Sequence, residues 1–231
     1  MNCRRSTWHL AGVFALLLLP AISMAQETEA EAETKPIAIA TMDGKSVAKL
    51  APENTRIEFI GTHVGDDPKP RLGGFKKFTG TIGIEDGHPV SVEVEMEIAS
   101  IWTEFDNLTK HLMNADFFEA AKFPNAGFKS TSVTIGEAGT CTVAGQLTLH
   151  GTTGEFEFPA KYEITDSGLV LMADFKLDRT KFGMDQMTDG VEKEVSLSVV
   201  VGQPTKNMES NDGNGSDDSN VSLKISLPNM S

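Results

Sequence analysis

Cysteine is almost absent from this chain. Its 231 residues include two, Cys3 and Cys141, and Cys3 falls in an N-terminal segment that we expect to be cleaved off. Cys141 then has no partner, so no intrachain disulfide can form. It alternates with apolar residues such as Val143 and Leu147, and no basic side chain flanks it to lower its pKa. We interpret Cys141 as a buried apolar side chain.

Positive charge is also scarce. The chain has 20 Lys and Arg residues against 33 Asp and Glu residues. Without residues 1–25 the count becomes 18 against 33, which is a net charge of −15 with His neutral. A protein this acidic, with no basic stretch, is not expected to bind nucleic acid or an anionic membrane surface.

Long apolar runs are lacking too. Leu10–Leu19 has ten residues, whereas a membrane-spanning helix needs about 20. This run follows Arg4 and Arg5 and precedes Ser23 and Ala25, which is the order of a secretory signal. We predict a signal peptide over residues 1–25, export to the periplasm and no stable insertion in a membrane.

Catalytic and metal-binding motifs are missing. No nucleophile elbow occurs, and Ser46–Lys49 fits Ser-x-x-Lys without the companion motifs of that enzyme class. The Asp- and Asn-rich segment 211–219 fails as a calcium loop at its glycine and glutamate positions. The histidines after residue 25 lack the spacing of a metal site; they are His63, His88, His111 and His150. We predict a protein that is not an enzyme and that has no metal site and no cofactor.

The chain is rich in alternating apolar residues. Val90, Val92, Val94 and Met96, for example, alternate with Ser91 and a row of glutamates, as in a half-buried strand. Short turns containing glycine separate such segments at 85–89, 137–139, 150–154 and 166–168, which favours antiparallel hairpins. We predict about eight strands, near 57–63, 78–84, 90–98, 126–135, 141–149, 156–164, 169–177 and 195–201.

The period changes between Trp102 and Phe123. Leu108, Leu112 and Ala115 fall at helical spacing, which predicts a short helix across one end of the sheet. On either side of the strands, residues 26–45 read as an acidic disordered spacer and residues 203–231 as a flexible Asn/Asp/Ser/Gly tail. Residues 46–202 form one domain. Its half-apolar strands can close as a barrel or stack as a sandwich, and the pattern alone does not choose.

Four segments, taken in order, resemble the YceI-like family of polyisoprenoid-binding proteins. They are Gly74–Gly80, His111–Phe118 with Phe123–Pro124, Gly145–Gly151, and Arg179–Met184. The resemblance covers residues 46–202 and implies an all-β, eight-stranded antiparallel, lipocalin-like barrel. It also implies an apolar channel that holds an isoprenoid lipid, such as a polyprenyl or quinone tail. The charged connection 65–71 departs from the family pattern and, if it rims the channel, implies a different head group.

The candidate channel residues are bulky apolar side chains on inward strand faces, where burial of a lipid tail needs no polar partner. The head-group candidates are His63, Arg71 and Arg179, although for Arg179, as for His111, bracing of loops is the favoured role. Two alternatives stay open: an enzyme of lipid or quinone metabolism using the same pocket, and a filled barrel that serves as a structural or partner-binding module. The channel candidates are Phe59, Phe75, Phe78, Ile82, Leu147, Phe156, Phe158 and Phe175.

Overall fold

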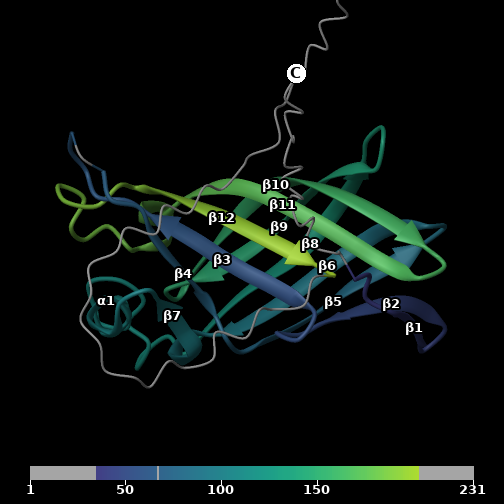
Figure 1. The fold of residues 1–231 in the computed structure, drawn as a ribbon, viewed down its shortest axis with the longest axis horizontal. Helices are drawn as coiled ribbons and strands as arrows, with labels where there is room; N and C mark the ends of the chain where they lie inside the picture. The colour runs from purple at the N-terminus through teal and green to yellow at the C-terminus, as the bar shows by residue number, and fades with distance from the viewer. Residues whose placement is uncertain (1–34, 67, 203–231) are drawn as a thin grey trace, which may run out of the picture. The chain divides into compact units, whose positions relative to one another are not determined.

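A computed structural model describes residues 35–66 and 68–202 (Figure 1). They form one antiparallel sheet, a short α-helix and two 3-10 turns. The strands are β1 Ile39–Met42, β2 Lys45–Leu50, β3 Thr55–Gly61, β4 Arg71–Phe75, β5 Phe78–Glu85, β6 His88–Glu97, β7 Ile101–Thr103, β8 Asn125–Ile135, β9 Thr140–Leu149, β10 Thr152–Thr165, β11 Gly168–Asp178 and β12 Glu194–Val201. The other elements are η1 Ile98–Ser100, α1 Asp106–Leu112 and η2 Arg179–Phe182.

Eleven of the twelve strand segments make up eight runs around a barrel, and β1 is a short edge strand paired with β2. The order of the twelve segments is β1-β2-β5-β6-β8-β9-β10-β11-β12-β3-β4-β7. Three of the runs are bent, and each consists of two segments: β2 continues into β3, β4 into β5, and β6 through η1 into β7. Hydrogen bonds continue across the last two junctions: the Lys76 amide donates to the Ser100 carbonyl (3.1 Å), and the Glu97 amide to the Lys77 carbonyl (3.0 Å).

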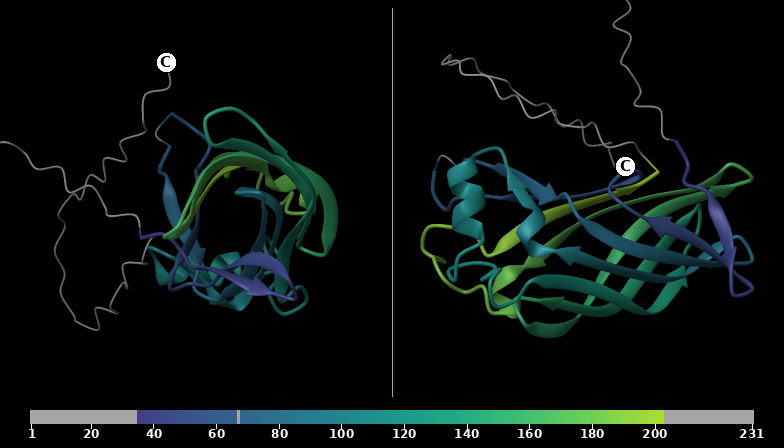
Figure 2. Two further views of the ribbon diagram at one scale, coloured as in Figure 1. Left: turned by 90° about the vertical axis from the view of Figure 1, so that its right-hand side faces the viewer. Right: turned by 90° about the horizontal axis from the view of Figure 1, so that it is seen from below.

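The sheet curls back on itself because β3 pairs with β12 on one side and with β4 on the other. Figure 2 shows this curl in the end-on view. The predicted strands correspond to β3, β5, β6 and β8 to β12, so the all-β antiparallel barrel is confirmed. The sequence pattern missed β1, β2, β4 and β7, which are short or belong to bent runs.

Four hairpins turn on two residues that both have positive φ, as in a type I′ turn. Asp86 and Gly87 (φ 50° and 77°) join β5 to β6, and His150 and Gly151 (φ 51° and 73°) join β9 to β10. Ala138–Gly139 has the same geometry between β8 and β9, and Asp43–Gly44 has it between β1 and β2. These turns match the right-handed twist of their strands and hold the hairpins in register.

The predicted boundary of the disordered spacer was wrong at its C-terminal end. Residues 39–45 lie in the β1–β2 hairpin, and Ile37 exchanges two backbone hydrogen bonds of 2.9 Å with Leu169. Ile37 is 5% exposed and belongs to the buried core cluster, as its bridge partner Leu169 does. The Asp43–Gly44 pair was the available hairpin signal. The predicted signal peptide, residues 26–34 of the spacer and the tail 203–231 lie outside the described residues.

The predicted helix is present at one end of the barrel, as α1, but it is shorter than the pattern suggested. It ends at Leu112, so Ala115 lies outside it. The Thr103 amide of β7 donates to Thr109 Oγ1 (3.0 Å), which ties the helix to the sheet. Leu112 packs with Ile101 and Phe117 in a small apolar cluster. In Figure 1, α1 and β7 lie at the end of the barrel opposite β1.

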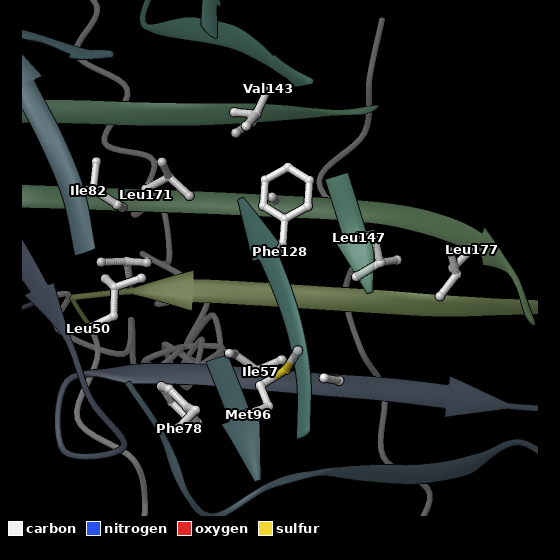
Figure 3. Close-up of a cluster of buried hydrophobic side chains, with 14 of the residues drawn as sticks. Leu50, Ile57, Phe78, Ile82, Met96, Phe128, Val143, Leu147, Leu171 and Leu177 are labelled. Carbon is white, nitrogen blue, oxygen red and sulfur yellow. The ribbon is translucent and has the colours of Figure 1, made fainter. Parts of the chain in front are cut away.

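The barrel interior holds the apolar face of every long strand. Figure 3 shows part of this core, including Leu50, Met96, Phe128 and Leu171. The alternation predicted for β6 fails at Val90, which is 40% exposed. A shift in register between Gly83 and Ile84 places Pro89 opposite Ile84 and leaves Val90 out of the ladder.

Candidate binding cavity

An apolar cavity of about 200 Å³ lies inside the barrel. Aromatic rings from the adjacent strands β10 and β11 line part of its wall. Phe158 and Phe175 stack with centroids 4.6 Å apart, and Phe156 lies 5.6 Å from Phe175. These residues face inward because Glu155, Glu157 and Lys176 occupy the alternate outer positions.

The cavity is long and narrow. Strand β12 contributes Val195, Leu197, Val199 and Val201 to its wall. At about 3.3 Å per residue these positions extend over roughly 20 Å. Spread over that length, a volume of about 200 Å³ leaves a tube with room for one slender chain, in keeping with an eight-stranded barrel.

One end of the cavity is closed. Leu50, Thr55, Ile82 and Val201 line that end and are at most 5% exposed. The Thr55 hydroxyl donates to Asn54 Oδ1 (2.8 Å), so its polar group is already satisfied. The buried Ile37 belongs to the same core cluster. We conclude that the cavity is blind on the side of the β1–β2 hairpin.

The other end lies near α1, where Gly61 and Val191 are half-buried lining residues. A Cβ at Gly61 would meet no atom within 4 Å, so there is open space at this point of the wall. Next to it, the rings of Phe59, Phe75 and Phe118 form a row with centroids about 6 Å apart. These features place the mouth of the cavity between the base of loop 62–70 and the base of loop 183–193.

Arg179 is the charged side chain in the wall, and its donors are engaged by backbone. Its Nε donates to the Glu192 carbonyl (3.0 Å) and its NH2 to the Val191 carbonyl (3.0 Å). Its NH1 donates to the carbonyls of Met184 and Gln186. Burial lowers the pKa of Arg179, and the charges of the nearby carboxylates partly oppose this. These bonds support the bracing role.

The structure brings most of the predicted channel residues together. Seven of the eight line the cavity, and the exception is Phe78. Phe78 is 5% exposed and belongs to the filled part of the core. The lining residues from the predicted set are Phe59, Phe75, Ile82, Leu147, Phe156, Phe158 and Phe175.

Two of the head-group candidates lie outside the wall. His63 lies beyond the end of β3 at Gly61 and is exposed, so the predicted strand near 57–63 is shorter than expected and His63 is not in the wall. Arg71 lies at the start of β4, where its guanidinium stacks on the ring of Phe105 at 4.9 Å. His63 follows the lining residue Gly61 closely in the sequence, and Arg71 is the strand partner of Gly61, but neither residue lines the cavity.

The sequence reasoning missed the lining residues near the mouth that belong to loops and to α1. These residues follow no strand period, so nothing in the local pattern distinguishes them from ordinary packing. They are Leu112, Phe117, Phe118, Met184 and Val191. The family resemblance included Leu112, Phe117 and Phe118 in segment His111–Phe118 and Met184 in segment Arg179–Met184, but it did not assign them to the channel wall.

Within residues 35–66 and 68–202, no cluster of three or more His, Cys, Asp or Glu side chains is arranged to hold a metal ion. The helices in those same ranges are all too short or too polar to cross a membrane. Cys141 is buried, as expected, and burial raises the pKa of its thiol.

Comparison with solved structures shows the same fold. BcnA of Burkholderia cenocepacia superposes with a TM-score of 0.59 at 18% identity, over 64% of this chain and 94% of that one. A polyisoprenoid binding domain from Saccharophagus degradans gives 0.52 at 14% identity, over 68% and 98%. The YceI protein of Campylobacter jejuni gives 0.52 at 22% identity, over 56% and 81%.

Sequence comparison gives the family. A UPF0312 protein of Pseudomonas putida is 36% identical over 92 residues, which are 39% of this chain and 48% of that protein. One from Pseudomonas savastanoi is 39% identical over 83 residues, 35% and 43% of the two chains. The chain thus spans about half the length of these curated relatives. The model of the YceI-like domain matches residues 49–202, two thirds of the chain, and the protein belongs to that family.

Proposed function

We propose that this protein binds one linear lipid chain of isoprenoid type, a polyprenyl or quinone tail, and carries or sequesters it after export to the periplasm. The long, blind, apolar cavity is the observation that carries this proposal. An apolar cavity of roughly 150 Å³ already holds a benzene-sized molecule. A cavity of about 200 Å³ drawn out along the barrel suits a slender chain better than a compact ring system.

The cavity recognises the tail and leaves the head group outside. Thr55 and Arg179, its two polar side chains, already have protein partners. A buried polar head group would lose its hydrogen bonds to water, at a cost of about 1–3 kcal/mol for each unsatisfied atom. An apolar tail gains about 25 cal/mol for each Å² removed from water. Ligands that share a tail but differ in head group are therefore expected to bind with similar affinity.

Two further features support the proposal. The Saccharophagus degradans domain of the same fold is described as polyisoprenoid binding. The N-terminal 25 residues have the order of a secretory signal, which supports export to a compartment where lipids must cross an aqueous space. The cavity is evidence against the alternative of a filled barrel that serves as a structural or partner-binding module, because its lining side chains leave space between them.

Native mass spectrometry tests the proposal directly. The full chain is expressed with its own leader, recovered from the periplasmic fraction, and measured before and after solvent extraction. We expect a mass addition that extracts as a prenyl chain or quinone. A protein of unmodified mass that stays unchanged after incubation with polyprenols and quinones in detergent would contradict the proposal. Recovery only from the cytoplasmic fraction would contradict export.

A further inference from the structure

Three large apolar side chains project into solvent around the mouth of the cavity. Phe105 is 51% exposed, Met187 is 47% exposed and Val64 is 46% exposed. Each comes from a different part of the chain: Val64 from the β3–β4 loop, Phe105 from the start of α1, and Met187 from the loop before β12. Single exposed apolar residues are common, but a group around one opening marks an interaction site.

These residues are tied to the mouth by direct contacts. The Val64 amide donates to the Gly190 carbonyl (3.1 Å), and the Gly190 amide donates to the Met187 carbonyl (3.1 Å). Val191, which follows in the chain, is part of the cavity wall. The two loops therefore form one rim, with Val64 and Met187 beside the opening.

Phe105 extends the same rim on the α1 side. Its ring lies under the guanidinium of Arg71, and Arg71 is the strand partner of the lining residue Gly61. The backbone around Phe105 is fixed, because the Thr103 hydroxyl donates to the Phe105 carbonyl (2.9 Å). The ring is thus held outward by the fold. Figure 1 shows the β3–β4 loop, α1 and the loop before β12 at the same end of the barrel.

Met187 is held in an unusual conformation. Its φ is 57°, in the left-handed region that residues other than glycine, asparagine and aspartate seldom adopt. The β-turn that begins here closes through the amides of Gly190 and Val191, which both donate to the Met187 carbonyl. The fold therefore exposes the apolar Met187 side chain to water, at a backbone position where glycine, asparagine or aspartate is more usual.

We propose that this rim, defined by Val64, Phe105 and Met187, docks on the surface of a lipid bilayer so that a lipid tail enters the cavity without crossing water. The proposal rests on the function proposed above. A bilayer fits the rim better than a protein does, because the rim surrounds the opening through which the tail must pass, and apolar and aromatic side chains at such a rim insert into the headgroup boundary.

The charge of the rim indicates the kind of bilayer. The described residues of segments 62–66, 68–71, 104–110 and 185–194 include seven acidic and four basic side chains. Anionic lipid attracts basic proteins and repels acidic ones. We therefore expect docking on a zwitterionic surface, driven by apolar insertion, and weaker docking when anionic lipid is added.

Vesicle flotation with the full mature chain tests this proposal. The rim variant combines Val64→Ser, Phe105→Ser and Met187→Asn, since asparagine tolerates the φ of residue 187. The matched control places serine at Met42, Ile135 and Met172, which are also exposed, by 41%, 39% and 43%, but lie away from the mouth. Thermal unfolding of all three proteins checks that the substitutions leave the fold intact.

On phosphatidylcholine vesicles we expect the wild type and the control to float and the rim variant to bind roughly tenfold more weakly. The rim variant should also take up a fluorescent polyprenol from these vesicles about tenfold more slowly, while its capacity for the same polyprenol delivered in detergent stays at the wild-type level. Phosphatidylglycerol in the vesicles should weaken binding of the wild type.

Equal binding and uptake by the rim variant and the wild type would overturn the docking proposal, and so would an equal loss in the control. Failure of the wild type to float would also overturn it and would leave the rim to a protein partner. Failure of every protein to load polyprenol from detergent would instead overturn the proposed function, so the two failures are distinguishable.

Discussion

At the scale of single residues, Arg179 shows how a buried charge can serve structure. It is 2% exposed, yet it donates to four backbone carbonyls between residues 184 and 192. These carbonyls belong to the loop whose end forms one side of the mouth. The planar guanidinium has five N–H donors in a fixed arrangement and can reach all four carbonyls. A lysine ammonium has only three donors, on a single nitrogen.

Arg179→Lys should therefore destabilise the protein by about 3 kcal/mol, because hydrogen bonds to a charged group contribute about 1.5–3 kcal/mol each and buried carbonyls lose their donors. Urea unfolding monitored by circular dichroism measures the change. Lys181→Met, two residues along and exposed, should stay within about 0.5 kcal/mol of wild type. Equal stability of Arg179→Lys and wild type would show that the loop does not depend on these bonds.

At the scale of elements, the short turn η2 depends on the carboxylate of Asp178, the residue that immediately precedes it. Asp178 Oδ1 accepts from the Thr180 hydroxyl (2.6 Å) and from the Thr180 amide (3.0 Å). The hydroxyl bond is the main cause that lowers the pKa of Asp178; burial opposes it, and the amide, Lys181 and Lys193 add to the lowering. A lowered pKa in the folded state means that ionised Asp178 favours folding at pH values above its unfolded pKa of about 3.9.

Thr180→Val removes the hydroxyl bond, so the pKa of Asp178 should move up toward its ordinary value. The stability advantage of wild type over this variant should be full at neutral pH and should shrink as the pH falls below about 3.9 toward the lowered pKa. An NMR titration of the Asp178 carboxyl, with urea unfolding at several pH values, measures both effects. Thr180→Ser keeps the hydroxyl and should titrate like wild type; a Val variant that did the same would refute the assignment.

The N-terminal segment 35–42 is an element that closes the blind end. Ile37 bridges to Leu169 and is 5% exposed, whereas Thr41 on the same segment is exposed. Ile37→Ala should cost about 2–4 kcal/mol, because a buried methyl-rich side chain leaves a cavity. Thr41→Ala should change the unfolding free energy by less than about 0.5 kcal/mol. If both variants unfold at the wild-type urea concentration, the segment does not seal the barrel.

At the scale of the whole molecule, the barrel contains a filled part and an open part. Phe78 and Phe158 both occupy inward positions, but Phe78 packs in the core and Phe158 faces the cavity. Phe158 stacks on Phe175, which also lines the cavity, whereas Phe78 is not among the lining residues.

Phe158→Trp should fill part of the cavity and displace bound polyprenol with little loss of stability, because free space is available for the larger ring. Phe78→Trp is the matched variant, and overpacking there should cost about 1–3 kcal/mol. Polyprenol binding by fluorescence and urea unfolding measure the two effects. If Phe158→Trp is destabilised as much as Phe78→Trp and binds polyprenol as well as wild type does, the cavity is not the binding site.

The sequence by itself determined the long strands, their inward faces and most of the tight turns. Apolar alternation records, residue by residue, which side of a strand is buried, so Phe156 and Phe158 were placed inward correctly. Glycine in the turns recorded the positive φ that hairpins need. The tertiary structure alone decided that the sheet closes through three bent runs, that the cavity is blind at Ile37, and that His63 lies outside the wall. These features depend on distances between residues far apart in the chain, and a local period carries no information about such distances.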